Sequence, residues 1–401
     1  MGIIGKTNVG KSTLFAALTL ATVDIANHPF TTIKPNIGIG YVRKKCVHVE
    51  LGLPQCNPRS GYCLRGNRFI PIKLMDVAGL IPGASKGRGL GNKFMDDLRQ
   101  ADALIHVVDA AGATDPEGNP VRPGTSDPVE EVVAIQKEVD TWFYTVVKRL
   151  WNNKISRHLF STRDPLELLV KSLSGLSITK YHVLEAIRKA GLEDKRIREW
   201  RDEDIQAFSK ALRSVSKPII VAANKADLPA AYDNIKRLKR EFGEERVIPI
   251  SALAEYILRK AALNSYIVYI PGDPEFRIIS SSKLTREQKK ALELIEDKVL
   301  KRYGSTGVQQ LINSVVFNIL RLIVVYPVEN HNKYTDHHGN VLPDAYLVQR
   351  DTTVRDLAYM VHTDLGNSFL YAINAKTGER VGENYVLEDN DVIKIVAAKA
   401  R

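Results

Sequence analysis

A glycine-rich stretch near the start of the sequence carries the residue types of a phosphate-binding loop. It reads GKTNVGKST and fits the P-loop pattern: a glycine, four residues, then Gly-Lys-Ser. In such a loop the backbone N–H groups converge on phosphate oxygens, the lysine neutralises the outer phosphates, and the serine hydroxyl ligates Mg²⁺. The sequence therefore predicts a phosphate chain with Mg²⁺, held by Gly5, Asn8, Val9, Gly10, Lys11, Ser12 and Thr13.

A second motif, NKAD at Asn224–Asp227, favours guanine over adenine as the base. The Asp227 carboxylate can accept the two N–H donors on the Watson–Crick edge of guanine, which adenine lacks. A site built to hydrogen-bond one ligand rejects an analogue without those groups by about 10⁴-fold. Asn224 is expected to brace the loop, and the stem of Lys225 to cover the base. Ser251–Ala252 is expected to offer a backbone N–H to the guanine carbonyl.

Two further segments have the pattern of γ-phosphate sensors. Asp76-x-x-Gly79 follows an apolar strand, so Asp76 can hold Mg²⁺ through water while the Gly79 N–H contacts the γ-phosphate. Thr31 and Thr32 lie in an earlier loop, where a threonine hydroxyl could complete the Mg²⁺ shell. Both loops would order on nucleotide triphosphate binding and relax after hydrolysis.

The elements that position these motifs alternate between apolar strands and helices. A helix is predicted over Lys11–Leu20, directly after the P-loop. Alternation of this kind indicates an α/β fold with a doubly wound, mostly parallel sheet. The predicted strands are Ile3–Ile4, Ile37–Val42, Phe69–Asp76, Ala101–Asp109, Pro218–Asn224 and Val247–Ala252.

The rest of the chain divides into three parts. Asp127 as N-cap and Pro128 at the first helical position open a helical insertion. Later, Thr285 and Gln288 form a capping-box pattern that starts a long helix, which Gly304 can close. The predicted division is a nucleotide-binding domain at 1–126 and 216–265, the insertion at 127–215, a helical connector at 266–322, and a small mixed β module at 323–401.

Composition indicates a protein without a membrane-spanning segment. Lysine and arginine outnumber aspartate and glutamate by 57 to 46, giving a net charge of +11. This excess favours nucleic acid or acidic surfaces as partners, although a merely soluble basic protein is the alternative. No apolar run reaches bilayer length and no secretory pattern is present, so a cytoplasmic location is expected. The sequence does not indicate an oligomeric state.

The motifs together closely resemble the Obg-like family of translation-factor-related GTPases, in its YchF branch. The resemblance rests on Asn27–Gly38 and Asp76–Ala110, and the tail at 342–396 is similar to the TGS module, a β-grasp domain. It implies that Thr32, rather than Thr31, ligates Mg²⁺, and that the protein works with the ribosome or RNA through the TGS domain and basic surfaces. Many members have a degenerate fourth motif and prefer ATP. Here Asn224–Asp227 is intact, which favours GTP and leaves ATP as the alternative.

The same resemblance bears on hydrolysis. In Ras-like enzymes a glutamine after the third motif's glycine orients the attacking water. This chain has Leu80 there, so slow intrinsic hydrolysis is expected. In related GTPases an asparagine at the position of Asn8 helps to hold K⁺; the alternative is that it only braces the loop. Arg88 could supply a positive charge to the phosphates from within the same chain; the alternative is that it is a solvated residue.

A cysteine and histidine cluster is a candidate metal site. Cys46, His48, Cys56 and Cys63 lie between the two strands that carry the sensor loops, and three thiolates with an imidazole suffice for tetrahedral Zn²⁺. Their spacing matches no standard zinc finger, and two thiols could instead pair or be buried. The loop histidines His331, His337 and His338 are interpreted as solvated.

Three functions are open at this point. The first is a GTPase switch with catalytic contributions from Lys11, Thr32, Gly79 and Asn8. The second is a nucleotide-dependent RNA- or ribosome-binding scaffold in which hydrolysis is incidental. A P-loop kinase is disfavoured, because nothing like a phosphoryl-acceptor lid accompanies the motifs.

Overall fold

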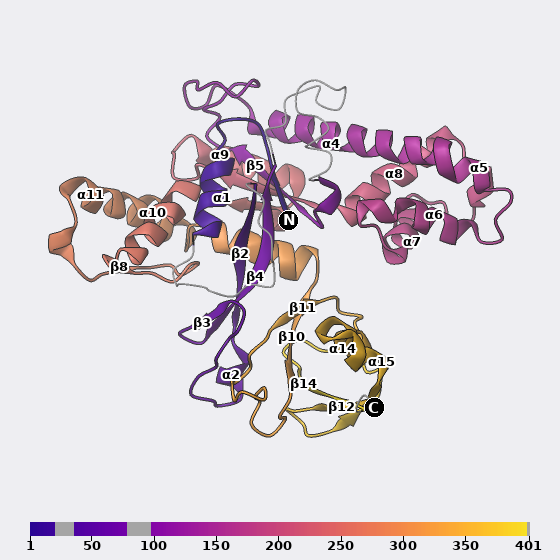
Figure 1. Ribbon diagram of the computed structural model, residues 1–401. Helices are drawn as coiled ribbons and strands as arrows, with labels where there is room; N and C mark the ends of the chain where they lie inside the picture. Colours follow the sequence, from indigo (N-terminus) through magenta and orange to yellow (C-terminus); the bar gives the residue numbers. More distant parts are fainter. Residues whose placement is uncertain (21–35, 78–97, 399–401) are drawn as a thin grey trace. The chain divides into compact units, whose positions relative to one another are not determined.

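The computed structural model describes residues 1–20, 36–77 and 98–398, which fall into two compact units (Figure 1). The first unit comprises Met1–Ala17, Pro35–Gly38 and Leu74–Val308. The second comprises Leu18–Lys34, Ile39–Lys73 and Gln309–Arg401. Within the described residues, no helix is both long and apolar enough to cross a bilayer.

A mostly parallel sheet with the strand order β2-β4-β1-β5-β6-β7 confirms the predicted fold class. In the first unit, β1 pairs in parallel with β4 and β5, and β6 lies in parallel between β5 and β7. Every residue of β5 and β6 is buried, as expected for parallel strands covered on both faces. The strands are β1 (Gly2–Ile4), β2 (Ile37–Lys45), β4 (Asn67–Asp76), β5 (Leu104–Asp109), β6 (Ile219–Asn224) and β7 (Val247–Pro249), and β3 (Tyr62–Leu64) pairs antiparallel with β4.

The register of the sheet brings the functional ends of the strands together. Ile3 lies opposite Asp76, and Asp109 lies opposite Asn224, so three motifs meet at the carboxyl edge. Ligands of open α/β sheets bind at this edge. The helices that follow β1, β6 and β7 begin there: α1 (Lys11–Thr19), α9 (Ala231–Phe242) and α10 (Ala252–Leu263).

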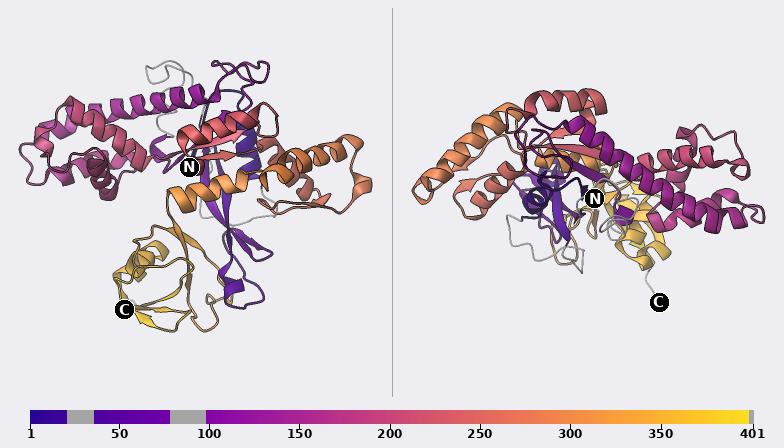
Figure 2. Two further views of the ribbon diagram at one scale, coloured as in Figure 1. Left: turned by 180° about the vertical axis from the view of Figure 1, so that it is seen from behind. Right: turned by 90° about the horizontal axis from the view of Figure 1, so that it is seen from above.

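A group of helices follows β5 and extends away from the sheet (Figure 2). The Asp127 carboxylate accepts a hydrogen bond of 2.9 Å from Val129 N–H and caps the first helix, as predicted. Trp142 and Trp151 are buried, and the Trp151 ring stacks on Trp200. The helices are α4 (Pro128–Leu150), continued by a π-helical turn at Trp151–Ile155, then α5 (Ser156–His158), α6 (Pro165–Leu173), α7 (Lys180–Lys189) and α8 (Asp202–Ser216).

The first unit ends with a hairpin and a long helix. β8 (Ile267–Val268) pairs antiparallel with β9 (Arg277–Ile278). The predicted capping box is present: Thr285 N–H donates to the Gln288 side chain, and Gln288 N–H donates to the Thr285 hydroxyl. The helix runs through α11 (Arg286–Ile295), a π-helical turn at Glu296–Leu300 and α12 (Lys301–Tyr303), and ends at Gly304 with φ +75°.

The second unit contains the predicted β module. Its sheet has the order β11-β10-β14-β12-β13, with the central pair β10 and β14 parallel. Helix α14 (Val354–Val361) covers this sheet, and α15 (Thr363–Asn367) follows. The strands are β10 (Ile323–Val328), β11 (Tyr346–Val348), β12 (Phe369–Asn374), β13 (Arg380–Val381) and β14 (Val392–Ala397).

The second unit also contains most of β2, all of β3, the short helix α2 (Val47–Glu50) and the helix that leads into the β module. That helix is α13 (Val308–Asn313), continued by a π-helical turn at Ser314–Ile319. Gln309 donates 2.9 Å to the carbonyl of Tyr41, and Asn313 donates 2.9 Å to the carbonyl of Arg43. These bonds attach the helix to β2.

Candidate nucleotide-binding site

Two glycines of the P-loop are required because a backbone or side-chain atom of another segment lies where their Cβ would be. Gly5 has φ +143°, and a Cβ there would lie 2.4 Å from the carbonyl oxygen of Val107. Gly10 has φ +99°, and a Cβ there would lie 2.2 Å from Nδ2 of Asn224. A side chain at either position would displace the loop, so the motif's glycines follow from packing as well as from phosphate access.

The side chain of Asn224 connects three loops. Its Nδ2 donates 2.8 Å to the carbonyl of Val9 in the P-loop, and its Oδ1 accepts 3.0 Å from the N–H of Ala252. Asn224 is 4% exposed. Both hydrogen bonds are therefore shielded from water, and removing the amide would leave buried backbone groups unpaired.

Asp109 holds the lysine of the NKAD loop. Lys225 has the left-handed backbone conformation, with φ +61°, and its Nζ donates 2.8 Å to Oδ2 of Asp109. The buried Asp109 carboxylate also accepts from the N–H groups of Ala111 and Ala113 and from the Thr114 hydroxyl. Sequence reasoning missed Asp109, although an aspartate that ends a mostly apolar, fully buried strand is a signal that could have found it.

Asp227, the predicted acceptor for the base, is oriented by the loop that contains Ser251. The Ser251 hydroxyl donates 2.8 Å to Oδ1 of Asp227, and the same oxygen of Ser251 caps α10 by accepting from Ala254 N–H at 3.4 Å. Within the described ranges, nothing donates to Oδ2 of Asp227. One carboxylate oxygen is therefore fixed and the other is left for a ligand donor.

Lys11, Ser12 and Asp76 lie together at the phosphate end. Lys11 Nζ donates 2.6 Å to the carbonyl of Lys6, and burial lowers the pKa of Lys11 against the opposing charges of Asp76 and Glu131. Burial raises the pKa of Asp76, while Lys11 and a hydrogen bond with Ser12 oppose that rise. A hydroxyl beside a carboxylate is an oxygen ligand set that suits Mg²⁺.

A segment at 111–127 braces the outer side of the P-loop, which sequence reasoning did not foresee. The Thr7 hydroxyl donates 3.1 Å to the carbonyl of Glu117, and Asn8 Nδ2 donates 2.8 Å to the carbonyl of Gly118. Lys6 Nζ donates 2.9 Å to the carbonyl of Thr114 and pairs at 3.0 Å with Glu131 on α4. The side chain of Asn8 is therefore held by this segment, and we call residues 111–127 the brace segment.

Three segments of the chain match known protein families. Residues 1–149 match the 50S ribosome-binding GTPase family, residues 222–330 match the G4 motif-containing domain of Obg-like GTPases of the YGR210 type, and residues 335–397 match the TGS domain. An uncharacterised GTP-binding protein of Methanocaldococcus jannaschii is 50% identical over 398 residues, covering 99% of each chain. The chain belongs to the Obg-like GTPase family, in its YchF branch.

Two further similarities span the length of this Obg-like protein. The crystal structure of a GTP-binding protein from Pyrococcus horikoshii is 42% identical, with a TM-score of 0.78 and coverage of 99% of both chains. A protein of Bacillus subtilis named ribosome-binding ATPase YchF is 27% identical, over 98% of this chain and 97% of its own length.

Some predicted site residues of this YchF-branch protein lie outside the described residues. They are the Mg²⁺ threonine candidates, the third-motif glycine and its neighbours: Thr31, Thr32, Gly79, Leu80 and Arg88. The other predicted nucleotide-site residues lie at the carboxyl edge of the sheet, on the ends of β4 and β6, on the loops that follow the strands, and on the first turns of α1 and α10.

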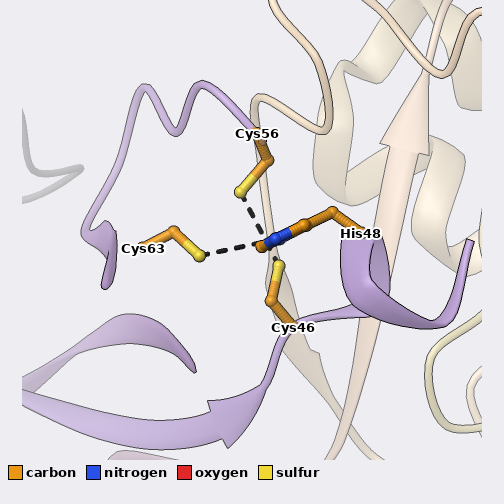
Figure 3. Close-up of side chains that lie close together, drawn as sticks. All are labelled: Cys46, His48, Cys56 and Cys63. Atoms are coloured by element: carbon orange, nitrogen blue, oxygen red, sulfur yellow. Dashed lines mark hydrogen bonds between the residues drawn. The ribbon is translucent and has the colours of Figure 1, made fainter. Parts of the chain in front are cut away.

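The cysteine and histidine cluster of this Obg-like protein lies in the second unit (Figure 3). The ligand atoms of Cys46, His48, Cys56 and Cys63 all lie within 4.8 Å of one another. The structure thus brings together four residues spread over 18 positions of the sequence.

Proposed function

We propose that this chain binds GTP with Mg²⁺ at the described site and hydrolyses it slowly, as a switch linked to the ribosome. The observation that carries the proposal is the Asp227 carboxylate, which accepts a 2.8 Å hydrogen bond from Ser251 on one oxygen. The other oxygen is left for a ligand donor. Lys11, Ser12 and Asp76 would hold the phosphates and Mg²⁺, which compensates phosphate charge.

The arrangement around Asp227 favours guanine over adenine. Guanine presents N1–H and N2–H₂ to a carboxylate. The backbone N–H groups of Ser251 and Ala252, expected to bind the guanine carbonyl, already donate to the carbonyl of Thr306 and to the side chain of Asn224. The preference for guanine therefore rests on Asp227 alone. Adenine presents an unprotonated N1 to the same carboxylate, which leaves the Asp227 charge unpaired. The Bacillus relative is named an ATPase. A preference for ATP is therefore the alternative, and a comparison of GTP and ATP affinities distinguishes the two.

Slow hydrolysis is proposed because Leu80 has no group that can orient water. Asn8 is the local candidate for K⁺ use, with loop bracing as the alternative; its amide donates to Gly118. Turnover in KCl compared with NaCl separates the two roles, since bracing alone gives equal rates.

The nucleotide test is the variant Asp227→Asn in the full chain. GTP affinity, measured by calorimetry, is expected to fall by at least about 10³-fold, because the amide cannot accept both guanine donors. Xanthosine triphosphate, which carries a carbonyl in place of the amino group, is expected to gain affinity. Unchanged GTP affinity, or tighter binding of ATP than of GTP by the unaltered chain, would overturn the guanine proposal.

The ribosome link rests on the TGS domain, the net charge of +11 and the name of the Bacillus relative, ribosome-binding ATPase YchF. Adding purified large ribosomal subunits is expected to raise GTP turnover. If subunits bind the chain but turnover stays at the basal rate in both K⁺ and Na⁺, the scaffold function replaces the switch.

A further inference from the structure

The ligand atoms of the four side chains in Figure 3 face one another, and all lie within 4.8 Å of each other. Sγ of Cys46 lies 3.7 Å from Sγ of Cys56, and Sγ of Cys63 lies 3.7 Å from Nδ1 of His48. Around a tetrahedral Zn²⁺ with ordinary bond lengths, sulfur atoms stand about 3.8 Å apart, and sulfur stands about 3.6 Å from nitrogen. We propose that Cys46, His48, Cys56 and Cys63 bind one structural Zn²⁺.

Local backbone geometry leaves these side chains available to a metal. Cys46 occupies the N-cap of α2, yet its side chain makes no capping hydrogen bond. Its backbone N–H donates 2.8 Å to the carbonyl of Gly66, which fixes the cysteine at the end of β2. A four-residue helix is too short to persist by itself, so α2 depends on contacts with the rest of the unit, and a metal bound by Cys46 and His48 would add one.

A buried cation beside the cluster is a second, independent observation. Arg68 is fully buried, and its Nη1 lies 3.6 Å from Sγ of Cys56. Among the described residues no carboxylate pairs with Arg68; its guanidinium donates to the carbonyls of Leu342 and Pro343. Three thiolates around Zn²⁺ carry one net negative charge, which the guanidinium neutralises. A buried unpaired cation would otherwise be strongly unfavourable.

The donor set selects the metal. Three sulfurs and one imidazole nitrogen suit Zn²⁺, whereas Mg²⁺ and Ca²⁺ require oxygen ligands. All four tetrahedral positions are filled by protein atoms, which is the arrangement of structural rather than catalytic zinc. Binding forms three Zn–S bonds and one Zn–N bond, releases the thiol protons to solvent and changes no oxidation state.

The proposed metal stabilises the segment between β2 and β3, which contacts the β module of the same unit. Asn57 N–H donates 2.8 Å to the carbonyl of Val341, and Arg59 N–H donates 2.8 Å to the carbonyl of Pro343. Arg59 also forms an ion pair with Asp344. Zinc would therefore hold the segment between β2 and β3 in place against residues 341–344.

Metal analysis of the full chain, purified under reducing conditions without chelator, tests the proposal. We expect about one zinc per chain, and loss of that zinc in Cys63→Ser and His48→Ala. The control His338→Ala alters an exposed histidine of the same unit and is expected to keep the metal. Retention of zinc by both ligand variants, or a Cys46–Cys56 disulfide in the reduced protein, would overturn the site.

Cobalt binding by the unaltered chain tests the same site without any substitution, so its result does not depend on whether a variant folds. Co²⁺ added to the unaltered, zinc-free chain is expected to give the visible bands of a tetrahedral centre and thiolate-to-cobalt charge transfer. Arg68→Lys keeps a cation near the site but loses the planar guanidinium, so Zn²⁺ affinity, measured by competition with a chelator, is expected to fall about 10–100-fold. Absence of tetrahedral cobalt bands would reject the proposal, whatever the nucleotide site does.

Discussion

The side-chain amide of Asn224 donates to the backbone carbonyl of Val9, 2.8 Å away in space and 215 residues away in the sequence. Through this bond and the one from Ala252 N–H, the NKAD loop, the P-loop and the start of α10 share one buried connector. With the nucleotide site proposed above, base recognition and phosphate binding would depend on a common geometry.

Replacing that connector should weaken nucleotide binding. Asn224→Ala leaves the Val9 carbonyl and the Ala252 N–H without partners, each at a cost of about 1–3 kcal/mol. We expect GTP affinity, measured by calorimetry, to fall by about 10–100-fold. Asn234→Ala is the matched control, because Asn234 also donates to a carbonyl, that of Ala110, from the side of α9. Equal losses in both variants would argue against the connector role.

The brace segment offers a comparison of two glycines. Gly118 and Gly124 have similar φ values of +91° and +85°, so alanine is strained at either. A Cβ at Gly118 would lie 1.9 Å from the Thr7 hydroxyl oxygen, whereas a Cβ at Gly124 meets nothing within 4 Å. We expect Gly118→Ala to weaken GTP binding several-fold and Gly124→Ala to leave it unchanged while lowering stability by about 1 kcal/mol. Identical nucleotide affinities would show that the brace does not shape the P-loop.

Asp109 should contribute to folding stability. Asp109→Asn keeps the shape but removes the charge that pairs with Lys225 Nζ at 2.8 Å. Breaking a buried ion pair typically costs 3–5 kcal/mol, and since Lys225 is 28% exposed at its side chain we expect about 2 kcal/mol. The free energies of unfolding of the variant and the unaltered chain, measured by urea denaturation, give this difference. An unchanged unfolding midpoint with normal GTP binding would contradict this assignment.

His106 on β5 should make the protein sensitive to acid. Burial lowers the pKa of His106 to about 3, with smaller contributions from Lys11 and Lys6. An unfolded histidine titrates near 6.5, so between about pH 3 and 6.5 the unfolded chain binds a proton that the folded chain does not. The stability due to this group is complete above pH 6.5 and is lost as the pH falls, by up to about 1.4 kcal/mol per pH unit.

The variant His106→Leu tests this dependence. Free energies of unfolding measured in urea from pH 7 to pH 5 should fall less steeply for the variant than for the unaltered chain. His338→Ala, at an exposed position, should keep the original slope. Parallel curves for His106→Leu and the unaltered chain would mean that His106 is not the titrating group.

Local chemistry explains why the sequence could predict which segments gather at the candidate site. In the P-loop, in the NKAD loop and at Asp76, the chemical groups lie at the end of a strand or within the few residues that follow it. Their positions therefore depend on short stretches of chain, and the spacing of residue types in the sequence is enough to predict them. The fold class followed from apolar strands such as Ala101–Asp109, whose buried core is β5. Strand ends were less accurate: β7 stops at Pro249, before the predicted Ala252, because Ser251 is the N-cap of α10.

What sequence reasoning missed depends on contacts between distant segments. Asn8 and Gly118 are 110 residues apart, and Lys225 and Asp109 are 116 apart. The acceptor at Gly118 is a backbone carbonyl, which no residue type reveals. β2 runs to Lys45, past the predicted Val42, into charged residues that ordinarily mark a strand's end; Lys44 there pairs with Asp389.

The ion pair between Lys6 and Glu131 joins the P-loop to the beginning of helix α4. Glu131 lies in the first turn of a helix of 23 residues, about 35 Å long. Lys6 belongs to the P-loop, and both partners of the ion pair are almost fully buried, with 7% and 8% of their side chains exposed. The position of the P-loop and the position of the first turn of this helix are therefore fixed relative to one another, and the helices that follow α4 are built outward from that point.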